Sequence, residues 1–353
     1  MKKKILICSA ISLILALILC ICINVKKNSL YDQMAASRWS EEGMVAQISV
    51  MYPVSDTEKT EDLYFTDLSH QIQKKLDESA YSDLAGNKDK SGISFPYSVS
   101  ITGKVSINSD SAGIELTAYG VEKDFFIFHP MNLLYGSYLY DDDVMDDGVI
   151  LDEDAAWRLF GSADIAGQSV MIGNVPHIVK GVVKKDEGKF ASAAGLNEPI
   201  CFLSLNSLKT YGRIYGSYDY EMIIPDPVDG TAITLLREVL GERADDLVIV
   251  ENSYRYNRDR MVDINHEKGI RSMSTKGVVF PYYENIARAW EDIFALGYFL
   301  IWIIVTINLI ILAIFIIKLL RSEAYKAFKK RIRHNLIYML KNIQRRSQNE
   351  KKE

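Results

Sequence analysis

Hydrophobic and polar positions divide the chain into two long apolar blocks and a polar middle. Residues 5–25 carry no charge, and residues 293–317 would span roughly 37 Å as a helix that rises 1.5 Å per residue. Both blocks therefore predict membrane-crossing helices. We favour an uncleaved anchor over a signal peptide for the first block, because its apolar core is long and residues 23–26 offer no small-residue cleavage site.

The segment between the blocks predicts a mixed α+β domain. Apolar alternation and short apolar runs between turn residues predict strands, whereas helical spacing of apolar positions predicts helices. The predicted strands outside residues 113–184 are 45–52, 97–107, 198–205, 220–225 and 247–251, and the predicted helices there are 63–81, 232–240 and 282–295. The helix at 63–81 is predicted from Leu63, Phe65, Leu68, Ile72 and Leu76. The sequence leaves open whether residues 232–251 close the same domain or begin a second lobe.

Three segments connect this domain to the apolar blocks. Residues 30–40 predict a stalk that continues the first membrane helix outward. Residues 252–276 are charged and irregular, which predicts a loop or an insertion. The helix at 282–295 places Ile286 and Trp290 on one side and leads directly into the second apolar block, so a force on the domain would reach the bilayer along it.

The most informative stretch, residues 113–184, predicts a strand, a short helix, a turn, a strand, a helix, a turn and two final strands. Asp152 is placed to cap the second of these helices, and Gly161 is placed to end it. Gly173 and Asn174 supply the tight turn of the closing hairpin. This hairpin can bury its apolar side only against a larger sheet, so the stretch predicts a small α+β unit.

Several short sequence segments in this stretch also resemble those of a known family. In order, they are Gly-Val followed by Asp-Phe-Phe within residues 120–126, Leu-Leu-Tyr-Gly-Ser-Tyr-Leu, an acidic run, Gly-Val-Ile-Leu-Asp-Glu-Asp-Ala-Ala-Trp-Arg-Leu-Phe-Gly, Asp-Ile-Ala-Gly-Gln-Ser-Val and His-Ile-Val-Lys-Gly-Val-Val. The ordered series resembles the extracytoplasmic core domain of MacB-like and FtsX-like ABC transporter permeases, closely over residues 113–184 and more loosely over 43–227. The resemblance implies an α+β extracytoplasmic domain between two transmembrane α-helices.

Charge predicts the orientation in the membrane. Residues 318–353 carry 12 Lys and Arg against 3 Glu, and Lys2, Lys3 and Lys4 add three more positive charges. Because the whole chain has a net charge of −5, the residues in between carry −17. Positively charged flanks stay in the cytoplasm, which predicts that both termini lie inside and that the acidic domain lies outside. Lys26 and Lys27 are a minor exception to this pattern.

Cysteine and histidine residues predict no reactive site. Three of the four cysteines lie in the first apolar block, and Leu19 before Cys20 is too large for a lipoprotein signal. Cys201 stands alone in the middle of the chain, which predicts a buried thiol and no internal disulfide. The five histidines are His70, His129, His177, His266 and His334. They show no metal-ligand spacing, and His177 is predicted to be structural.

Two loops resemble ligand loops, and we reject both. Residues 161–168 have one residue too many for a phosphate loop and Gln168 in place of its lysine, so we predict no ATP hydrolysis by this chain. The acidic run 141–148 has Met145 at a calcium-ligand position, and Asp154 stands where a bidentate glutamate belongs, which favours a solvated turn. The tyrosines of 211–220 predict edge packing or a contact surface. No catalytic, cofactor-binding or metal-binding residue is predicted.

The tail has a regular pattern. Apolar residues recur at helical spacing between many Lys and Arg residues from 325 to 346. They are Phe328, Ile332, Leu336, Leu340 and Ile343. A basic amphipathic helix next to a membrane is typical of a segment that lies on the anionic inner leaflet. The alternative is that it docks on a cytoplasmic ATPase.

These features predict four parts: a transmembrane helix (1–27), an extracytoplasmic domain (28–290), a second transmembrane helix (291–320) and a basic cytoplasmic tail (321–353). The resemblance implies a non-enzymatic permease component that transmits the motion of a separate ATP-binding subunit, for export of peptides or lipid-linked substrates. Its implied partners are that cytoplasmic ATPase, the lipid bilayer and another permease subunit or a second copy, with no nucleic acid. Such permeases have four membrane helices and this chain has two, so a bitopic sensor or scaffold remains the alternative.

Overall fold

The computed structural model describes residues 2–40, 43–57, 59–60, 63–79, 81, 84, 86–140, 145–267, 274–275, 277–321, 325–335 and 337. The chain forms two compact units. The domain unit is Ile23–Leu296, and the helical unit combines Met1–Cys22 with Gly297–Glu353.

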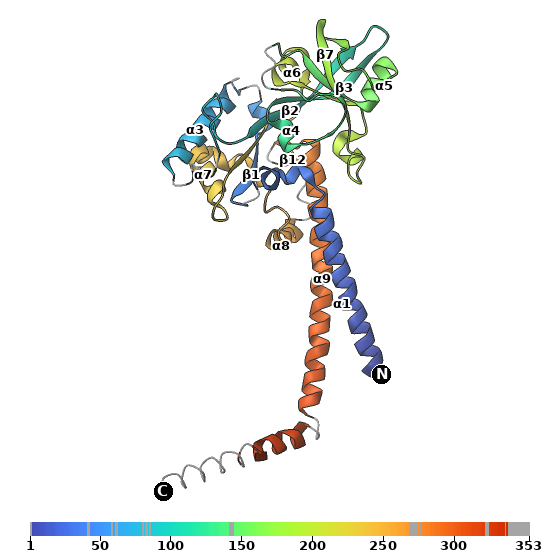
Figure 1. The fold of residues 1–353 in the computed structure, drawn as a ribbon, viewed down its shortest axis with the longest axis vertical. Coiled ribbons are helices and arrows are strands. Elements are labelled where there is room, and N and C mark those ends of the chain that lie inside the picture. Colours follow the sequence, from blue (N-terminus) through green and yellow to red (C-terminus); the bar gives the residue numbers. More distant parts are fainter. Residues whose placement is uncertain are drawn as a thin grey trace, which may run out of the picture. The chain divides into compact units, whose positions relative to one another are not determined.

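An 11-stranded mixed sheet forms the centre of the domain unit as far as its residues are described (Figure 1). The strands are β1 (Val45–Met51), β2 (Tyr97–Asn108), β3 (Gly113–Lys123), β4 (Asn132–Gly136), β5 (Gly148–Asp152), β6 (Ser169–Ile172), β7 (Val175–Lys184), β8 (Ile200–Ser204), β9 (Arg213–Ile214), β10 (Asp219–Pro225) and β11 (Val248–Glu251). Their order is β11-β1-β10-β2-β3-β8-β5-β7-β4, with β6 paired to β2 and β7 and with β9 paired to β2. Because β11 pairs with β1, the segment that the sequence left open closes the same domain.

The helices are α1 (Lys2–Lys27), α2 (Ala35–Trp39), α3 (Tyr64–Glu78), α4 (Phe125–Phe128), α5 (Glu153–Phe160), α6 (Leu205–Tyr211), α7 (Thr231–Leu240), α8 (Arg258–Glu267) and α9 (Tyr282–Leu320). Helices α3 and α7 pack against each other beside β1 and β10. Ile72 of α3 lies in the same core as Ile48 of β1, Val99 of β2 and Tyr220 of β10. Each of these strands contributes alternate residues to this core. One face of these three strands is therefore an ordinary apolar core.

The stretch from 113 to 184 folds largely as its pattern predicts. The Asp152 carboxylate accepts a hydrogen bond from the Ala155 amide at 2.8 Å and caps α5, which ends at Gly161 in a left-handed conformation. Gly173 and Asn174 both have positive φ, as a tight hairpin turn requires. Strand β4 was not predicted. It pairs with β7 through a bulge, which interrupts the alternation by which a strand is recognised.

Two predictions outside this stretch are wrong. Residues 30–40 do not extend the first helix, because α1 ends at Lys27 and the short helix α2 buries Ala35 and Ala36 in a small core of the domain unit. Residues 258–267 form helix α8 and not a loop. Met261 and Ile264 are buried there, one helical turn apart, and the charged residues around them hide this spacing in the sequence.

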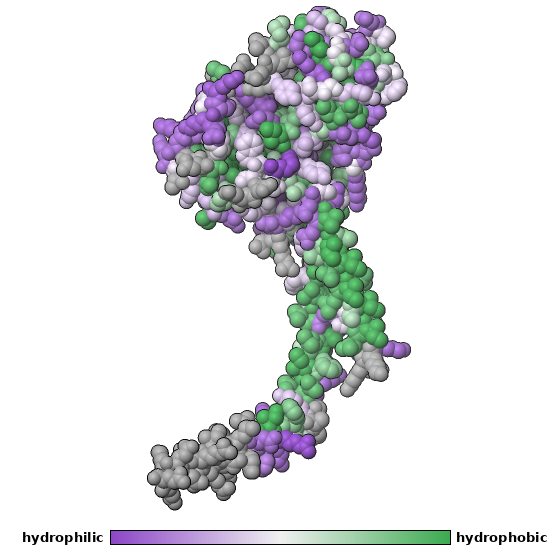
Figure 2. Space-filling model, viewed as in Figure 1, coloured by the Kyte–Doolittle hydropathy of each residue, from purple (hydrophilic) through white to green (hydrophobic). Residues whose placement is uncertain are grey.

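The helical unit contains the two apolar stretches, which are covered by large hydrophobic side chains (Figure 2). Helices α1 and α9 are both long and apolar enough to cross a membrane. Asn308 of α9 is only 8% exposed and donates a hydrogen bond to Ser12 Oγ at 3.0 Å, while Ser9 Oγ donates to Asn308 Oδ1. In lipid an unpaired amide would be unfavourable, so these contacts favour association of the two helices.

Part of the predicted tail helix is described. Residues 325–335 are helical, and Phe328 and Ile332 are exposed there among lysines and arginines. Leu336, Leu340 and Ile343 lie outside the described residues. The amphipathic helix is thus confirmed over its first three turns, and the rest stays a prediction.

The first prediction concerns two leucines near the start of α3, which the sequence placed on the same apolar face. Leu68 is 4% exposed and lies in the main core, but Leu63, just before α3, is 68% exposed. We expect Leu68→Ala to lower the free energy of unfolding by about 2–5 kcal/mol, because it leaves a cavity. Leu63→Ala should change it by less than about 0.5 kcal/mol.

Chemical denaturation of the full chain in detergent micelles measures both effects. The two variants carry the same substitution five residues apart, so each serves as the control of the other. Equal losses of stability would contradict the packing of α3 described above.

Candidate functional site: a buried polar network

The second face of β1, β10 and β2 is polar, yet it is buried. Strand alternation places Gln47 and Ser49 of β1, Asp219 and Glu221 of β10 and Ser100 of β2 on this face. In the sheet register Ser49 lies opposite Glu221, and Asp219 lies opposite Ser100. All five side chains are buried. They are hydrogen-bonded to groups from the segment after α1, from the turn after β11 and from the first turns of α9.

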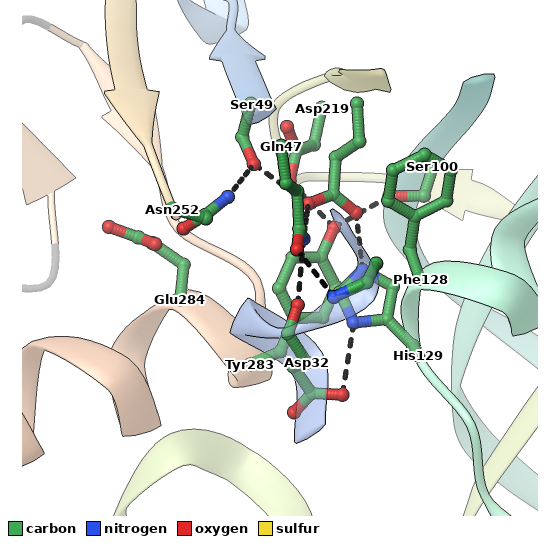
Figure 3. Close-up of polar contacts among 12 residues, drawn as sticks. Asp32, Gln47, Ser49, Ser100, Phe128, His129, Asp219, Asn252, Tyr283 and Glu284 are labelled. Carbon is green, nitrogen blue, oxygen red and sulfur yellow. Dashed lines mark hydrogen bonds and ion pairs between the residues drawn. The ribbon is translucent and has the colours of Figure 1, made fainter. Parts of the chain in front are cut away.

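His129, which follows α4, lies at the centre of this face (Figure 3). Its Nδ1 contacts the Asp32 carboxylate at 3.2 Å, and its Nε2 makes a short hydrogen bond to Glu221. The ring stacks on Tyr283 of α9 with 3.7 Å between the ring centroids. His129 thus joins the segment after α1, strand β10 and the start of α9.

Tyr283 extends the same contacts to β2. Its hydroxyl donates to Asp219 Oδ2 at 2.7 Å and lies 2.9 Å from Ser100 Oγ. On the other side of the network, Gln47 accepts a hydrogen bond from the Ala35 amide at 2.9 Å and donates to the Asp32 carbonyl at 2.7 Å. The start of α2 and the start of α9 are therefore both hydrogen-bonded to this face of the sheet.

Burial and charge shift the protonation of the network. Burial alone would lower the pKa of His129, but the charge of Glu221 and the hydrogen bonds to Asp32 and Glu221 raise that pKa to about 10. Burial and the neighbouring Glu221 charge raise the pKa of Asp219 well above its ordinary value. We therefore assign a protonated, positively charged His129 at neutral pH, and its neighbour Asp219 is shifted toward its neutral form.

A second group of charges surrounds Arg255, in the turn after β11. Its guanidinium donates to Glu291 at 2.7 Å and to Glu284 at 2.8 Å, and all three side chains are at most 2% exposed. Although burial would raise the pKa of Glu284, the charges of Arg255 and Arg288 lower it to about 2. Arg255 thus holds two carboxylates of α9.

One chain of hydrogen bonds joins the two groups of charges. Arg255 donates to Asn252 at 3.0 Å, Asn252 donates to Ser49 at 2.7 Å, and Ser49 donates to Glu221 at 2.7 Å. The side chains of Asn252 and Ser49 face each other from β1 and the neighbouring turn (Figure 3). We call the side chains that are joined in this way the polar network. Its members are Asp32, Gln47, Ser49, Ser100, His129, Asp219, Glu221, Asn252, Arg255, Tyr283, Glu284, Arg288 and Glu291.

The polar network is suited to fixing elements in place. It contains no cysteine, and no group of three His, Cys, Asp or Glu side chains in the described part of the chain could hold a metal ion. Its members come from β1, β2, β10, the turn after β11, the segments after α1 and α4, and α9. Removing one partner of such a buried pair leaves an unpaired charge, which strongly disfavours any rearrangement that separates them.

Of the residues that the sequence analysis named, His129 lies in the polar network, but the others described here lie elsewhere. Cys201 is fully buried, as predicted, and burial raises its pKa. His177 contacts the Val175 carbonyl at 3.0 Å and Ser207 at 3.3 Å, which confirms a structural role. Asp154 pairs with Lys185 at 2.6 Å. Residues 141–144 of the acidic run lie outside the described residues, so the solvated turn there stays a prediction.

Sequence reasoning missed every charged member of the polar network. Asp219 and Glu221 alternate with apolar residues, which is also the pattern of a strand with one face in water. The available signal was that the strands at 45–52, 97–107 and 220–225 all carry polar residues at alternate positions, while the amphipathic helix at 282–295 also contains the acidic residues Glu284 and Glu291. The tyrosines of 211–220 are mostly packing residues, since Tyr218 and Tyr220 are fully buried.

Fold and site define an α+β domain whose buried polar face is hydrogen-bonded to the segment after the first apolar helix and to the start of the second. The family model of the MacB-like periplasmic core domain matches residues 10–239, well over half of the chain. The chain therefore belongs to this family, which confirms the resemblance seen in the sequence. A periplasmic-domain family and two apolar helices together indicate a membrane protein with an extracytoplasmic domain.

Individual relatives share only part of the chain. The macrolide export ATP-binding/permease protein MacB of Chromobacterium violaceum is 24% identical over 151 residues, which is 42% of this chain and 22% of that protein. The chain thus spans about a fifth of the length of this relative. Among solved structures, the periplasmic region of MacB from Actinobacillus actinomycetemcomitans is 17% identical to this chain, with a TM-score of 0.40. The match covers 64% of this chain and 93% of that structure's chain. The extracellular domain of the noncanonic ABC-type transporter YknZ from Gram-positive bacteria is 15% identical, with a TM-score of 0.33 and coverages of 55% and 93%.

The second prediction concerns the pH dependence of stability. Because folding raises the pKa of His129 from about 6.5 to about 10, its contribution to stability is complete below about pH 6.5 and is lost as the pH rises through 10. We expect the free energy of unfolding to fall by on the order of 2–4 kcal/mol between pH 6.5 and pH 10, and His129→Gln to flatten this slope. Denaturation series at several pH values measure it. His177→Gln removes a buried imidazole without a carboxylate contact in the described structure and should keep the wild-type slope.

The third prediction concerns Arg255. Arg255→Met leaves Glu284 and Glu291 buried without their shared partner, so we expect a loss of about 3–5 kcal/mol in the free energy of unfolding. Adding Glu284→Gln and Glu291→Gln should restore part of this loss, because the uncompensated charges are then gone. Lys88→Met, which breaks an exposed pair with Asp77, should leave the free energy of unfolding close to that of the wild type, because water screens that pair. A loss for Arg255→Met as small as that of the control would show that the pairs contribute little.

Proposed function

We propose that this protein is a membrane component of an ABC transporter of the MacB type, whose ATP-binding subunit is a separate chain. In this proposal both termini are cytoplasmic, the domain unit lies outside, and motion of the membrane helices moves the domain. The family, the two apolar helices and the charge pattern support it: the tail carries net positive charge, whereas the residues between the apolar stretches are acidic.

The observation that carries the mechanism is the attachment of α9. This helix runs without interruption from Tyr282 to Leu320 and so includes both the polar network contacts and the second apolar stretch. Within its first ten residues, Tyr283 is hydrogen-bonded to β10 and β2, while Glu284 and Glu291 are paired with Arg255. A rotation or shift of the start of α9 would have to separate these buried groups or take the sheet with it.

Directional contacts matter for such a role. Apolar packing tolerates sliding and rotation, because one methyl group can replace another, but a buried ion pair is satisfied in few geometries. The polar network therefore favours movement of the domain with the base of α9 over slippage between them. We propose that ATP-driven motion reaches the outer domain in this way and acts there on a peptide or a lipid-linked substrate.

The transmembrane surface is open to a partner in the same proposal. Large apolar side chains cover most of α9 between Phe299 and Leu320. Either lipid or another permease subunit, including a second copy of this chain, would satisfy that surface. The exposed basic helix at 325–335 is the element that we expect to meet the cytoplasmic ATP-binding subunit.

The fourth prediction tests the ATP-binding partner. Full-length tagged protein is extracted from its native membrane in a mild detergent, and the co-purifying proteins are identified by mass spectrometry. We expect an ATP-binding subunit in near-equal amount. Exchanging Lys329, Lys330, Arg331 and Arg333 for Gln should reduce its recovery at least about fivefold, because each contact with a charged group contributes about 1 kcal/mol or more.

A matched variant separates loss of docking from a general effect of charge. Lys74, Lys75, Lys88 and Lys104 lie on the domain unit, and their exchange for Gln removes the same total charge without touching the tail. Recovery with this variant should equal that of the wild type. If no ATP-binding subunit appears with the wild type, and an envelope protein appears instead, the transporter proposal fails and the two-helix chain is a sensor or scaffold.

A further inference from the structure

A cavity of about 390 Å³ lies in the domain unit next to the polar network. Its wall is formed by four segments: residues between 26 and 33 from the end of α1 onward, residues 130–132, residues 184–190 from the end of β7, and the α9 residues Tyr282, Ile286 and Trp290. Asp32 of the polar network lines it too. The volume is within the range of small-molecule sites, and the wall mixes aromatic, aliphatic and charged side chains.

Two lysines in this wall stand over a pair of aromatic rings. Lys26 Nζ lies 4.6 Å from the ring centroid of Trp290, and Lys189 Nζ lies 5.1 Å from that of Phe190. The two rings contact each other edge to face at 5.2 Å between centroids. Two ammonium groups are therefore held on one aromatic pair, where each is attracted by a ring face and both are available to an anion.

The other charges of the wall already have partners. Lys184 pairs with Glu187 at 3.6 Å, and Lys185 pairs with Asp154 at 2.6 Å. Asp32 contacts His129, and Asp186 accepts a hydrogen bond from the Gly188 amide at 2.8 Å. Among the described residues, no carboxylate pairs with Lys26 or Lys189. An anionic ligand would relieve the repulsion between these two positive charges.

The position of the pair along the chain points to the membrane surface. Lys26 directly follows the first apolar stretch, and Trp290 stands three residues before the second. Tryptophan and lysine at such positions are typical of the boundary between hydrocarbon and water. Lys26 is also one of the two lysines at the outer end of the first helix, where the preference of positive charge for the cytoplasmic side would place none. An anionic ligand on the outer side would account for a lysine at this position.

We propose that this cavity binds the phosphate headgroup of an anionic phospholipid from the outer leaflet, with Lys26 and Lys189 on the phosphate. Ile286, Phe190 and Trp290 provide the apolar surface for the glycerol and the upper acyl chain, which a free phosphate would leave unused. The proposal rests on the outer location of the domain in the proposed function. A bound headgroup would bridge the end of α1, the loop after β7 and the start of α9.

The fifth prediction tests the lipid site on the full-length protein in maltoside detergent. Dioleoyl phosphatidylglycerol and dioleoyl phosphatidylcholine are titrated separately, and native mass spectrometry counts the lipids retained. We expect one phosphatidylglycerol to be retained in preference to phosphatidylcholine. Lys26→Gln with Lys189→Gln should weaken its apparent affinity about 30-fold, since each lysine near a membrane surface contributes a factor of about five.

Two further variants keep the test decisive. Lys88→Gln with Lys104→Gln removes the same charge from exposed positions elsewhere and should leave the affinity within about twofold. Lys26→Arg with Lys189→Arg keeps both charges and should retain the preference for phosphatidylglycerol even if the Gln variant folds poorly.

Three results would overturn the lipid site. The first is equal retention of the two lipids by the wild type, which would mean ordinary annular lipid. The second is a Gln variant that folds normally and binds as the wild type does. The third is full displacement of phosphatidylglycerol by millimolar inorganic phosphate, which would make free phosphate the ligand. None of these results depends on an ATP-binding partner, so the lipid site and the transporter proposal can fail separately.

Discussion

The attachment of α9 to the sheet depends on charges that are buried away from water. Moving Arg255, Glu284 and Glu291 out of water is unfavourable, and their mutual attraction restores that free energy only while their geometry is kept. An apolar replacement of similar shape would often be as stable. What the ionic contacts add is specificity, because they allow few arrangements of α9 against the turn after β11.

The sheet also contributes to this attachment, because one of its faces is apolar and the other is polar. Apolar residues of β1, β10 and β2 face α3 and α7, and the residues between them face the polar network. Since side chains alternate strictly along a strand, a shift of one residue in β10 would exchange Glu221 with Tyr220 and would disrupt both faces. The register of the central strands and the position of α9 therefore depend on each other.

The sequence predicted the elements whose signals are local. The cap at Asp152, the turn at Gly173 and the amphipathic helix α3 each rest on residues within or next to one element, of which the longest, α3, has 15 residues. The polar network was not predictable in this way, because Asp32 and His129 are 97 residues apart and Ser49 and Glu221 are 172 apart. Polar alternation in a strand is the same whether water or a buried partner covers that face. Only the arrangement of the covering segments distinguishes the two cases.

Polar contacts also occur in the helical unit. Asn308 is hydrogen-bonded to Ser9 and Ser12 within otherwise apolar helices, where packing against lipid tails gives little preference for one neighbour over another. A hydrogen bond in hydrocarbon has no water to replace it, so it selects one face of α9 for α1. In each unit, then, the orientation of α9 about its own axis is set by polar groups.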